Sequence, residues 1–515
     1  MRYLSFLKNE YFLYFIFYFF SYFLILINYE AVYWDGWALY NHSIDALESQ
    51  FYQNSGAAGS IIVFIHWLML KKGVFLYRLL TFLLFFANVY FVNKILKSLE
   101  VLDKKDVFFL TLFFAIAPLY TDRILIINFI YNLCLFIFYF AFFLLTKYIN
   151  KKNFILRIII LGLFFFSFLA NSLLVFYFIV LMYLYFKEYG NLKLSFSKLK
   201  NYIIKYIDFI ALPFIFFVIK ILFFKPSGLY AGYNSIDIFN PLVYIGILYT
   251  FYTSFIEPIN ISLSFLSIIW ILVVIIVIFY RKIDFLDKKY DKIILLLGMF
   301  IFALAVYPYL AVHKIPNLWD TESRHQLLLL LPFSIILYFL IKNFSKKINI
   351  YTILIVTFIF SFTAFNIKTY YDFLTDWFYR VSLMENIKNN KLIKQNSTII
   401  FDDTEFLKFL AEKRKISFYE YSGMLKKVFN NDTKLGVSVL KFKGINYYFK
   451  YNKYPQYNYL HWKFNKRKIV MVKIEPVRIS TSKLFYLTYL YYFKKDMFKK
   501  YIKGLLRLKT KVIHV

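Results

Sequence analysis

Long apolar runs alternate with short lysine-rich segments over the first two thirds of this 515-residue chain. Many of these runs approach the roughly 20 apolar residues that an α-helix needs to cross a bilayer. The pattern therefore predicts an α-helical polytopic membrane protein with about eleven transmembrane helices. We expect them near residues 10–29, 74–93, 107–120, 124–146, 156–170, 172–187, 206–224, 257–280, 293–311, 326–342 and 349–366.

A further apolar run, residues 241–256, has two interpretations. As a twelfth span it would place the basic segment 281–292 outside, against the tendency of Lys and Arg to remain on the inner side. As an interfacial or re-entrant helix it leaves every connection consistent, and we prefer this interpretation. The first run follows Arg2 and Lys8 and is not followed by a small-residue cleavage site. We therefore predict an uncleaved first span and not a signal peptide.

The lysines and arginines between the runs indicate an orientation. With the N-terminus inside, the inner connections hold twenty-three of them, and the outer connections hold only Lys71, Lys72, Arg78, Arg123, Lys225, Lys314 and Arg324. This asymmetry predicts a cytoplasmic N-terminus and places everything after Phe365 outside.

The chain changes character after residue 368. The segment "STIIFDDTEFLKFL" is typical of a strand, a turn and a helix, while "VSVLKFKGINYYFKYN" and "KRKIVMVKIE" alternate apolar and polar residues as strands do. We therefore expect a transmembrane domain over 1–368 and a small α+β extracytoplasmic domain over 369–515. The basic end, "YYFKKDMFKKYIKGLLRLKTK", fits either a helix lying on anionic lipid or a solvated tail.

Composition supports a membrane protein and limits its partners. Hydrophobic residues make up 61% of the chain and aromatic residues 24%, and the mean hydropathy is +0.59. Such values lie outside the range of soluble domains. The net charge of +33 would suit nucleic acid, but most cations punctuate the apolar runs. We therefore expect the lipid bilayer as partner and no nucleic acid. The single cysteine, Cys134, excludes an internal disulfide and a cysteine-based zinc site.

One acid stands out in the first outer loop, "YWDGWALYNH" (residues 33–42). No lysine or arginine occurs between residues 30 and 70. We therefore predict that Asp35 is an unpaired carboxylate near the membrane, in a loop that Trp34 and Trp37 anchor at the interface. Such a carboxylate can take a proton from an acceptor hydroxyl. The structural alternative is an aromatic belt with an Asp-Gly turn.

Two further outer clusters carry candidate chemistry. Asp122 and Arg123 begin a very short turn in "APLYTDR", and Glu322, Arg324 and His325 directly precede a span in "VHKIPNLWDTESRHQLLLLLPFSI". Acids from one loop and cations from others suit a phosphorylated, lipid-linked donor and a hydroxyl acceptor, because a cation offsets charge on the departing phosphate. The alternatives are an ion pair or helix cap for the first cluster and interfacial snorkelling for the second.

Together these features resemble the GT-C superfamily of membrane glycosyltransferases, which includes protein O-mannosyltransferases and aminoarabinose transferases. Asp35 occupies the place of the family's catalytic acid, and residues 56–70 that of its interfacial helices. "FLYRLLTFLLFFANVYFV" is similar to the arginine-led second span, and "FAIAPLYTDRILIINFIYNLCLFIFYFAFFLL" to the third and fourth. "ESRHQLLLLLPFSIIL" resembles the late arginine-led span. A soluble outer C-terminal domain is also common in the family.

The resemblance implies an inverting sugar transfer from a polyprenyl-phosphate donor to a glycan, lipid or protein acceptor. The reaction would take place on the outer face of the cytoplasmic membrane of a bacterium. Asp35 would act as base, and Asp122 would orient the acceptor or assist. Many relatives carry two adjacent acids in the first loop, and here Gly36 occupies the second place, so we predict no cofactor and no metal. The substrate-binding residues would be Arg123, Arg324, His325, Glu322 and Arg78.

Three other functions remain open at this stage. A flippase or exporter of lipid-linked glycans would place charges inside several spans, whereas charge within these runs is scarce. A polysaccharide polymerase would use arginine-rich outer loops, and these loops are poor in arginine. The third alternative is an inactive member of the fold that serves as a scaffold, since the second acid is missing.

Overall fold

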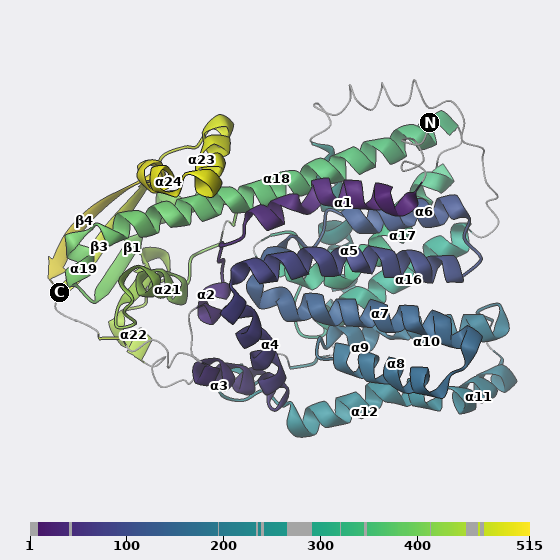
Figure 1. The fold of residues 1–515 in the computed structure, drawn as a ribbon. Helices are drawn as coiled ribbons and strands as arrows, with labels where there is room; N and C mark the ends of the chain where they lie inside the picture. The colour runs from purple at the N-terminus through teal and green to yellow at the C-terminus, as the bar shows by residue number, and fades with distance from the viewer. Residues whose placement is uncertain are drawn as a thin grey trace.

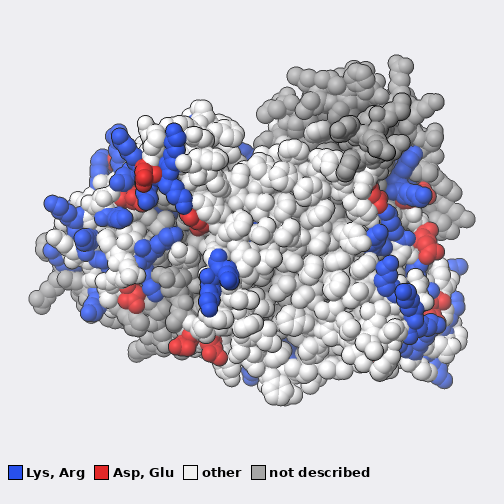
Figure 2. Space-filling model, in the orientation of Figure 1, with Lys and Arg blue, Asp and Glu red and all other residues white. Residues whose placement is uncertain are grey.

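The computed structural model describes residues 9–40, 44–193, 195–232, 235–237, 241–264, 291–319, 321–344, 348–412, 414–449, 462–463 and 468–514. A body of long helices carries a smaller unit with a sheet at one end (Figure 1). Figure 2 shows charged side chains gathered at the two ends of the molecule, with a broad, mostly uncharged surface between them. This distribution is expected of a multi-pass membrane protein, because lipid-facing surface must be apolar.

Seven helices of the described part are long and apolar enough to cross a membrane. The number becomes eight if α11 (Phe196–Lys205) and α12 (Ile207–Phe223), bent by 69° at their junction, form one broken span. The seven are α1 (Glu10–Ile27), α5 (Val74–Ser98), η4 with α7 (Ile126–Asn128, Phe129–Lys151), α9 with α10 (Ser172–Phe176, Phe178–Tyr189), α16 (Asp291–Leu310), η7 with α17 (Glu322–Leu329, Leu330–Phe344) and α18 (Ile348–Lys388).

The predicted count of eleven is not confirmed. Helices do lie at the predicted spans 107–120 and 156–170, but α6 (Lys104–Ile116) has 13 residues and α8 (Phe154–Ser167) has 14. The predicted span 257–280 falls largely outside the described residues. The remaining short elements before it are α2 (Gly36–Leu39), α3 (Ile44–Ser55), α4 (Ala58–Lys72), η3 (Thr121–Ile124) and η5 (Gly228–Tyr230).

The run 241–256 does not end where the sequence pattern suggested. Helix α13 (Pro241–Phe251) continues through a π-helical turn, η6 (Tyr252–Ile256), directly into α14 (Glu257–Leu263). The hydroxyls of Thr253 and Ser254 in this turn donate to the carbonyl of Pro316, at 2.8 and 2.9 Å. The widened turn therefore ties this helix to the segment that leads into η7.

Local sequence explains where several of these helices begin and end. Asn9 caps α1 by accepting from the backbone N–H of Tyr11, and Glu10 lies in the first turn, where the helix dipole favours an acid. Gly190 ends α10 in the left-handed conformation.

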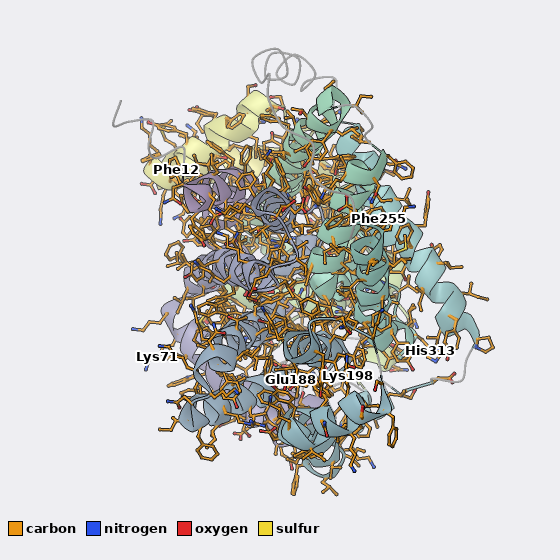
Figure 3. The ribbon with its side chains drawn as sticks, turned by 90° about the vertical axis from the view of Figure 1, so that its right-hand side faces the viewer. Phe12, Lys71, Glu188, Lys198, Phe255 and His313 are labelled. Carbon is orange, nitrogen blue, oxygen red and sulfur yellow. The ribbon has the colours of Figure 1, made fainter. Side chains whose placement is uncertain are left out.

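Figure 3, viewed from the end opposite the C-terminal unit, shows side chains filling the space between the helices. Three tyrosines of α1, Tyr14, Tyr18 and Tyr22, are buried in this interior.

A buried charge cluster joins three helices at the end of the body where α18 begins. The ammonium group of Lys342 in α17 lies 3.1 Å from Asp106 of α6 and 3.0 Å from Asp291 of α16. The hydroxyl of Tyr338 also donates to Asp106, at 2.6 Å. Because these charges are buried, their mutual pairing fixes how the three helices pack.

Helix α18 runs 41 residues, from the helical body into the C-terminal unit (Figure 1). It passes through residue 368, so the boundary predicted there falls inside one continuous helix. The long helix therefore connects the two parts of the molecule without a linker.

The C-terminal unit contains a four-stranded sheet in the order β2-β1-β3-β4. β1 (Thr398–Asp402) is parallel to β2 (Leu435–Ser438) and β3 (Lys468–Pro476), and β4 (Leu506–His514) is antiparallel to β3. Around it lie α19 (Lys391–Gln395), α20 (Thr404–Leu407), α21 (Phe418–Phe429), η8 (Val439–Lys441), α22 (Ile445–Phe449), α23 (Thr481–Phe493), α24 (Lys495–Ile502) and η11 (Lys503–Leu505).

Two sequence interpretations of this unit were right and two were partly wrong. Strands β1 and β3 lie where they were expected. The segment 437–452 was expected to be a strand, but only its first two residues belong to β2, and η8 and α22 follow. The basic C-terminal segment divides into helix α24 and strand β4. The apolar side chains of β4 pack on one face and its lysines face out. Over so short a segment, the sequence of such a strand is difficult to distinguish from that of an amphipathic helix.

Candidate functional site

Three loops meet at the end of the helical body next to the C-terminal unit. They are the loop after α1 with Asp35, the turn η3 with Asp122, and the start of η7 with Arg324. The hydroxyl of Ser323 in η7 accepts from the backbone N–H of Asp122 at 2.9 Å and from the hydroxyl of Thr121 at 2.8 Å. The structure thus brings together the three clusters that the sequence placed on one side.

Arg78 and Tyr33 fix the loop that carries Asp35. The Arg78 guanidinium donates to the carbonyl of Asn28 at 3.2 Å and to that of Ala31 at 2.5 Å. The Tyr33 hydroxyl donates to the carbonyl of Phe373 in α18 at 2.6 Å. Arg78 is 1% exposed, so it holds the loop from within and is closed off from a substrate. Its predicted role in substrate binding finds no support in this position.

Asp35 precedes the short helix α2 and is partly buried. Its carboxylate accepts a hydrogen bond from the hydroxyl of Tyr419 in α21. The prediction of an unpaired acid was therefore wrong: its partner comes from the C-terminal unit. Burial raises the pKa of Asp35 to about 6, although the Tyr419 hydrogen bond and the charge of Arg324 oppose the shift. At neutral pH the group is mainly ionised and still able to accept a proton.

The two tryptophans of this loop pack against other parts of the protein. Trp37 is 1% exposed and covers Gly423 of α21. The ring of Trp34 lies 4.7 Å from the guanidinium carbon of Arg324, a cation–π contact. The glycine between them is required by packing, since a Cβ at Gly36 would lie 2.8 Å from Cγ1 of Ile126.

Arg324 is held by its own neighbours on η7. Its Nε donates to Nε2 of His325 at 3.2 Å, and Nδ1 of His325 lies 2.7 Å from the carboxylate of Glu322. In this arrangement the imidazole is neutral, with its proton on Nδ1, because Nε2 accepts. Glu322 and His325 therefore orient Arg324, and Arg324 retains 19% side-chain exposure. The three residues form the cationic part of the site.

Asp122 is buried, at 1% exposure. Burial raises its pKa to about 8, and the charge of Glu412 adds to the shift, while Ser323 and Arg324 oppose it. The carboxyl group is thus mainly protonated at neutral pH and is able to donate a hydrogen bond. Within the described part of the chain, its Oδ2 atom has no hydrogen-bond partner. Asp35 and Asp122 therefore carry different protonation states beside one arginine, a separation typical of acid–base sites.

Arg123 lies next to Asp122 but faces the interior. Its guanidinium donates to the carbonyls of Tyr120 and Leu119, at 3.0 and 2.9 Å. It also stacks on the rings of Tyr22 and Phe85, at 4.4 and 4.5 Å. With 2% exposure it supports the turn, and its predicted contact with the donor phosphate finds no support.

Strained backbone precedes both acids. Trp34 has φ 45° and Tyr120 has φ 54°, a left-handed conformation that bulky side chains rarely adopt. Gln326 of η7 accepts from the backbone N–H of Tyr120 at 3.1 Å. Such strain persists only where surrounding contacts enforce it, and it concentrates at functional sites. Its presence at both turns supports a functional role for this end of the molecule.

Sequence reasoning missed the C-terminal half of the site. A buried network of Arg380, Arg414, Glu412 and Glu420 lies behind Tyr419, with Arg414 in contact with Glu420 at 2.6 Å and with Glu412 at 3.0 Å. Burial alone would raise the pKa of Glu420, but the charges of Arg414 and Arg380 hold it below its usual range. A capping box, Ser417 with Glu420, begins α21 and was detectable in "SFYE". Nothing local indicated that Tyr419 would reach Asp35.

No protein-family model, curated protein or solved structure matches this chain. Among the residues that the structure describes, no group of three or more His, Cys, Asp or Glu side chains is arranged to hold a metal ion. The function therefore has to be argued from the site itself and from the sequence resemblance.

Proposed function

We propose that this protein is a membrane glycosyltransferase of the GT-C type. It moves a sugar from a polyprenyl-phosphate donor to a glycan, lipid or protein acceptor on the outer face of a bacterial cytoplasmic membrane. The observation that carries the proposal is the position of Asp35, whose pKa is raised to about 6, near the guanidinium of Arg324, which stacks on the adjacent Trp34. The order of motifs along the chain supports the same reaction class.

The chemistry follows from the two groups. Asp35 removes the proton of the acceptor hydroxyl, and the acceptor oxygen attacks the anomeric carbon from the face opposite the phosphate. The bond between the anomeric carbon and the phosphate oxygen breaks, and the phosphate leaves with the electron pair. Arg324 offsets the charge that develops on this leaving group. Inversion at the anomeric carbon follows from a single displacement.

Asp122 has the supporting role in this scheme. A protonated carboxyl group cannot act as base, but it can donate a hydrogen bond to an oxygen of the acceptor or sugar. The pKa of about 8 keeps Asp122 in this form at neutral pH. Asp35 is therefore assigned the proton transfer and Asp122 the orientation of the substrate.

The decisive experiment is mass spectrometry of envelope glycans from a deletion strain of the native host. The strain is complemented with wild type, Asp35→Asn, Asp35→Glu or Asp45→Asn at equal expression. Asp45 lies on exposed surface of α3 and provides a matched control in the same outer segment. We expect wild type and Asp45→Asn to restore a missing sugar, Asp35→Glu to restore it partly, and Asp35→Asn to fail. Full restoration by Asp35→Asn would exclude Asp35 as base.

The proposal also requires the C-terminal unit to face outward. A reporter fused after Val515 tests this directly, with an active outer-side reporter as the expected result. An inner-side signal would place the site on the cytoplasmic face and would contradict the assigned donor.

A further inference from the structure

A cavity lies in the C-terminal unit. It has a volume of about 360 Å³ and lies between α18, α21 and α24. This size is within the range of small-molecule and headgroup sites. Four lysines and three aromatic side chains dominate its lining: Lys388, Lys427, Lys495 and Lys499, with Trp377, Tyr491 and Phe498.

The charge of this cavity is positive, because its lining holds more lysines than acids. None of the four lysines lies within ion-pair distance of a described carboxylate. Two acids, Glu30 and Glu385, also line the cavity, and Glu30 accepts from the hydroxyl of Tyr491 at 3.0 Å. Lys427 faces aromatic rings, at 4.7 Å from Tyr40 and 5.5 Å from Trp377. The cavity therefore suits an anionic ligand, whose negative charge would offset the excess of lysines.

The cavity lies at the end of the first candidate span. Tyr492 of α23 donates a hydrogen bond to the carbonyl of Ile27, the last residue of α1. Glu30, three residues further on, lines the cavity. The cavity is thus placed at the level where the uncharged surface of the helical body gives way to charged surface, which is where lipid headgroups lie.

Helix α23 presents an apolar face beside the cavity. Phe485, Tyr489 and Phe493 recur every four residues, so they share one face of the helix, and they are 65%, 48% and 75% exposed. Figure 2 shows an uncharged surface in this region of the C-terminal unit with a row of basic side chains next to it. An aromatic face flanked by lysines is the pattern of a helix that lies in a membrane interface.

We propose that this cavity binds the phosphate-bearing headgroup of an anionic lipid, with the aromatic face of α23 embedded in the same leaflet. The commitment to a lipid rests on the position at the end of α1 and on the continuity with the apolar face. The site is distinct from the candidate transfer site: Tyr419 and Lys427 lie eight residues apart on α21, which is about 12 Å along the helix. The inference concerns binding and goes beyond the proposed sugar transfer.

The test is native mass spectrometry of the purified full-length chain from nanodiscs that contain phosphatidylglycerol and phosphatidylcholine. The cavity variant Lys495→Gln/Lys499→Gln is compared with Lys494→Gln/Lys500→Gln, which removes the same charge from the same helix outside the cavity lining. Neither pair is buried, so both variants are expected to fold.

We expect the cavity variant to retain phosphatidylglycerol roughly tenfold less than wild type, since each lysine near an anionic lipid contributes measurably to binding. The control pair lies outside the cavity lining, so its phosphatidylglycerol retention should stay within about twofold of wild type. Phosphatidylcholine retention should not change. Equal loss in both variants would show diffuse surface attraction and overturn the site. Complete displacement of phosphatidylglycerol by millimolar inorganic phosphate would overturn the lipid as ligand. Because the readout is lipid retention, it is independent of transferase activity.

Discussion

The hydroxyl of Tyr419 donates a hydrogen bond to the carboxylate of Asp35, across a sequence separation of 384 residues. This bond joins the loop after α1 of the helical body to helix α21 of the C-terminal unit. It stabilises the ionised form of Asp35, while burial favours the protonated form. The C-terminal unit therefore contributes to the pKa of the candidate base, by lowering it against the larger effect of burial.

Replacement of Tyr419 by Phe should raise the pKa of Asp35 further, because the variant loses a donor to the carboxylate. The acid limb of the pH–activity profile is then expected to move to higher pH, so the variant loses more activity at pH 6 than at pH 8. Tyr421→Phe, on the same helix as Tyr419, is the matched control, since the Tyr421 hydroxyl donates to Asp403 and not to Asp35. An unchanged acid limb in Tyr419→Phe would show that Asp35 does not control it.

Asp122 should make the protein less stable as the pH rises. Its folded-state pKa of about 8 lies above the ordinary 3.8, so the folded chain holds this proton more tightly than the unfolded chain does. The stability it provides is complete below roughly pH 4 and is lost progressively as the pH rises through 8. Thermal melts should therefore show that the Tm of Asp122→Asn, relative to the Tm of wild type, rises as the pH increases from about 4 to about 8. Asp45→Asn, on exposed surface, should show no such trend.

Arg324 should be required for binding the phosphate of the donor. With polyprenyl phosphate as probe, we expect Arg324→Gln to weaken binding at least roughly tenfold. Arg324→Lys should recover only part of the lost affinity, because an ammonium group lacks the planar guanidinium that stacks on Trp34. Arg478→Gln, on exposed surface of the C-terminal unit, controls for net charge. Identical affinities for Arg324→Gln and this control would remove Arg324 from the site.

Gly36→Ala should disturb the Asp35 loop through a steric clash with Ile126. The added Cβ would lie 2.8 Å from Cγ1 of that side chain, so either helix α2 or the Ile126 side chain must shift. Overpacking of this kind costs about 1–3 kcal/mol, and we expect lower thermal stability together with lower activity. Truncation of the neighbour in Gly36→Ala/Ile126→Ala should recover part of both. A double variant no better than Gly36→Ala would point to a different cause.

Lys342→Met should be the most destabilising of these changes. It leaves Asp106 and Asp291 buried without their shared cation, and such a loss costs about 3–5 kcal/mol. Thermal unfolding in detergent measures the effect. The control is Lys97→Met, which removes a solvent-exposed pair with Glu10 and should change stability by less than about 1 kcal/mol.

The structure separates the predicted cations into two groups that looked alike in the sequence. Arg78, Arg123 and Arg324 each begin or precede an apolar helix near the same end of the body. Arg78 and Arg123 turn inward to backbone carbonyls, and Arg324 turns toward Trp34 and the acids. The difference depends on which backbone carbonyls and aromatic rings lie close to each arginine once the helices have packed. The sequence around each arginine does not indicate this.

By itself, the sequence determined the helical, membrane-type body, the strands β1 and β3, and the three loops that hold the acids and cations. These features depend on the length and period of apolar runs, which are local properties. Three features became visible in the folded chain alone: Tyr419 pairs with Asp35, burial raises the pKa of Asp122, and the basic C-terminal segment completes a sheet. Each of these depends on contacts between segments far apart in the chain, because burial and hydrogen-bond partners are set by packing and not by neighbours in sequence.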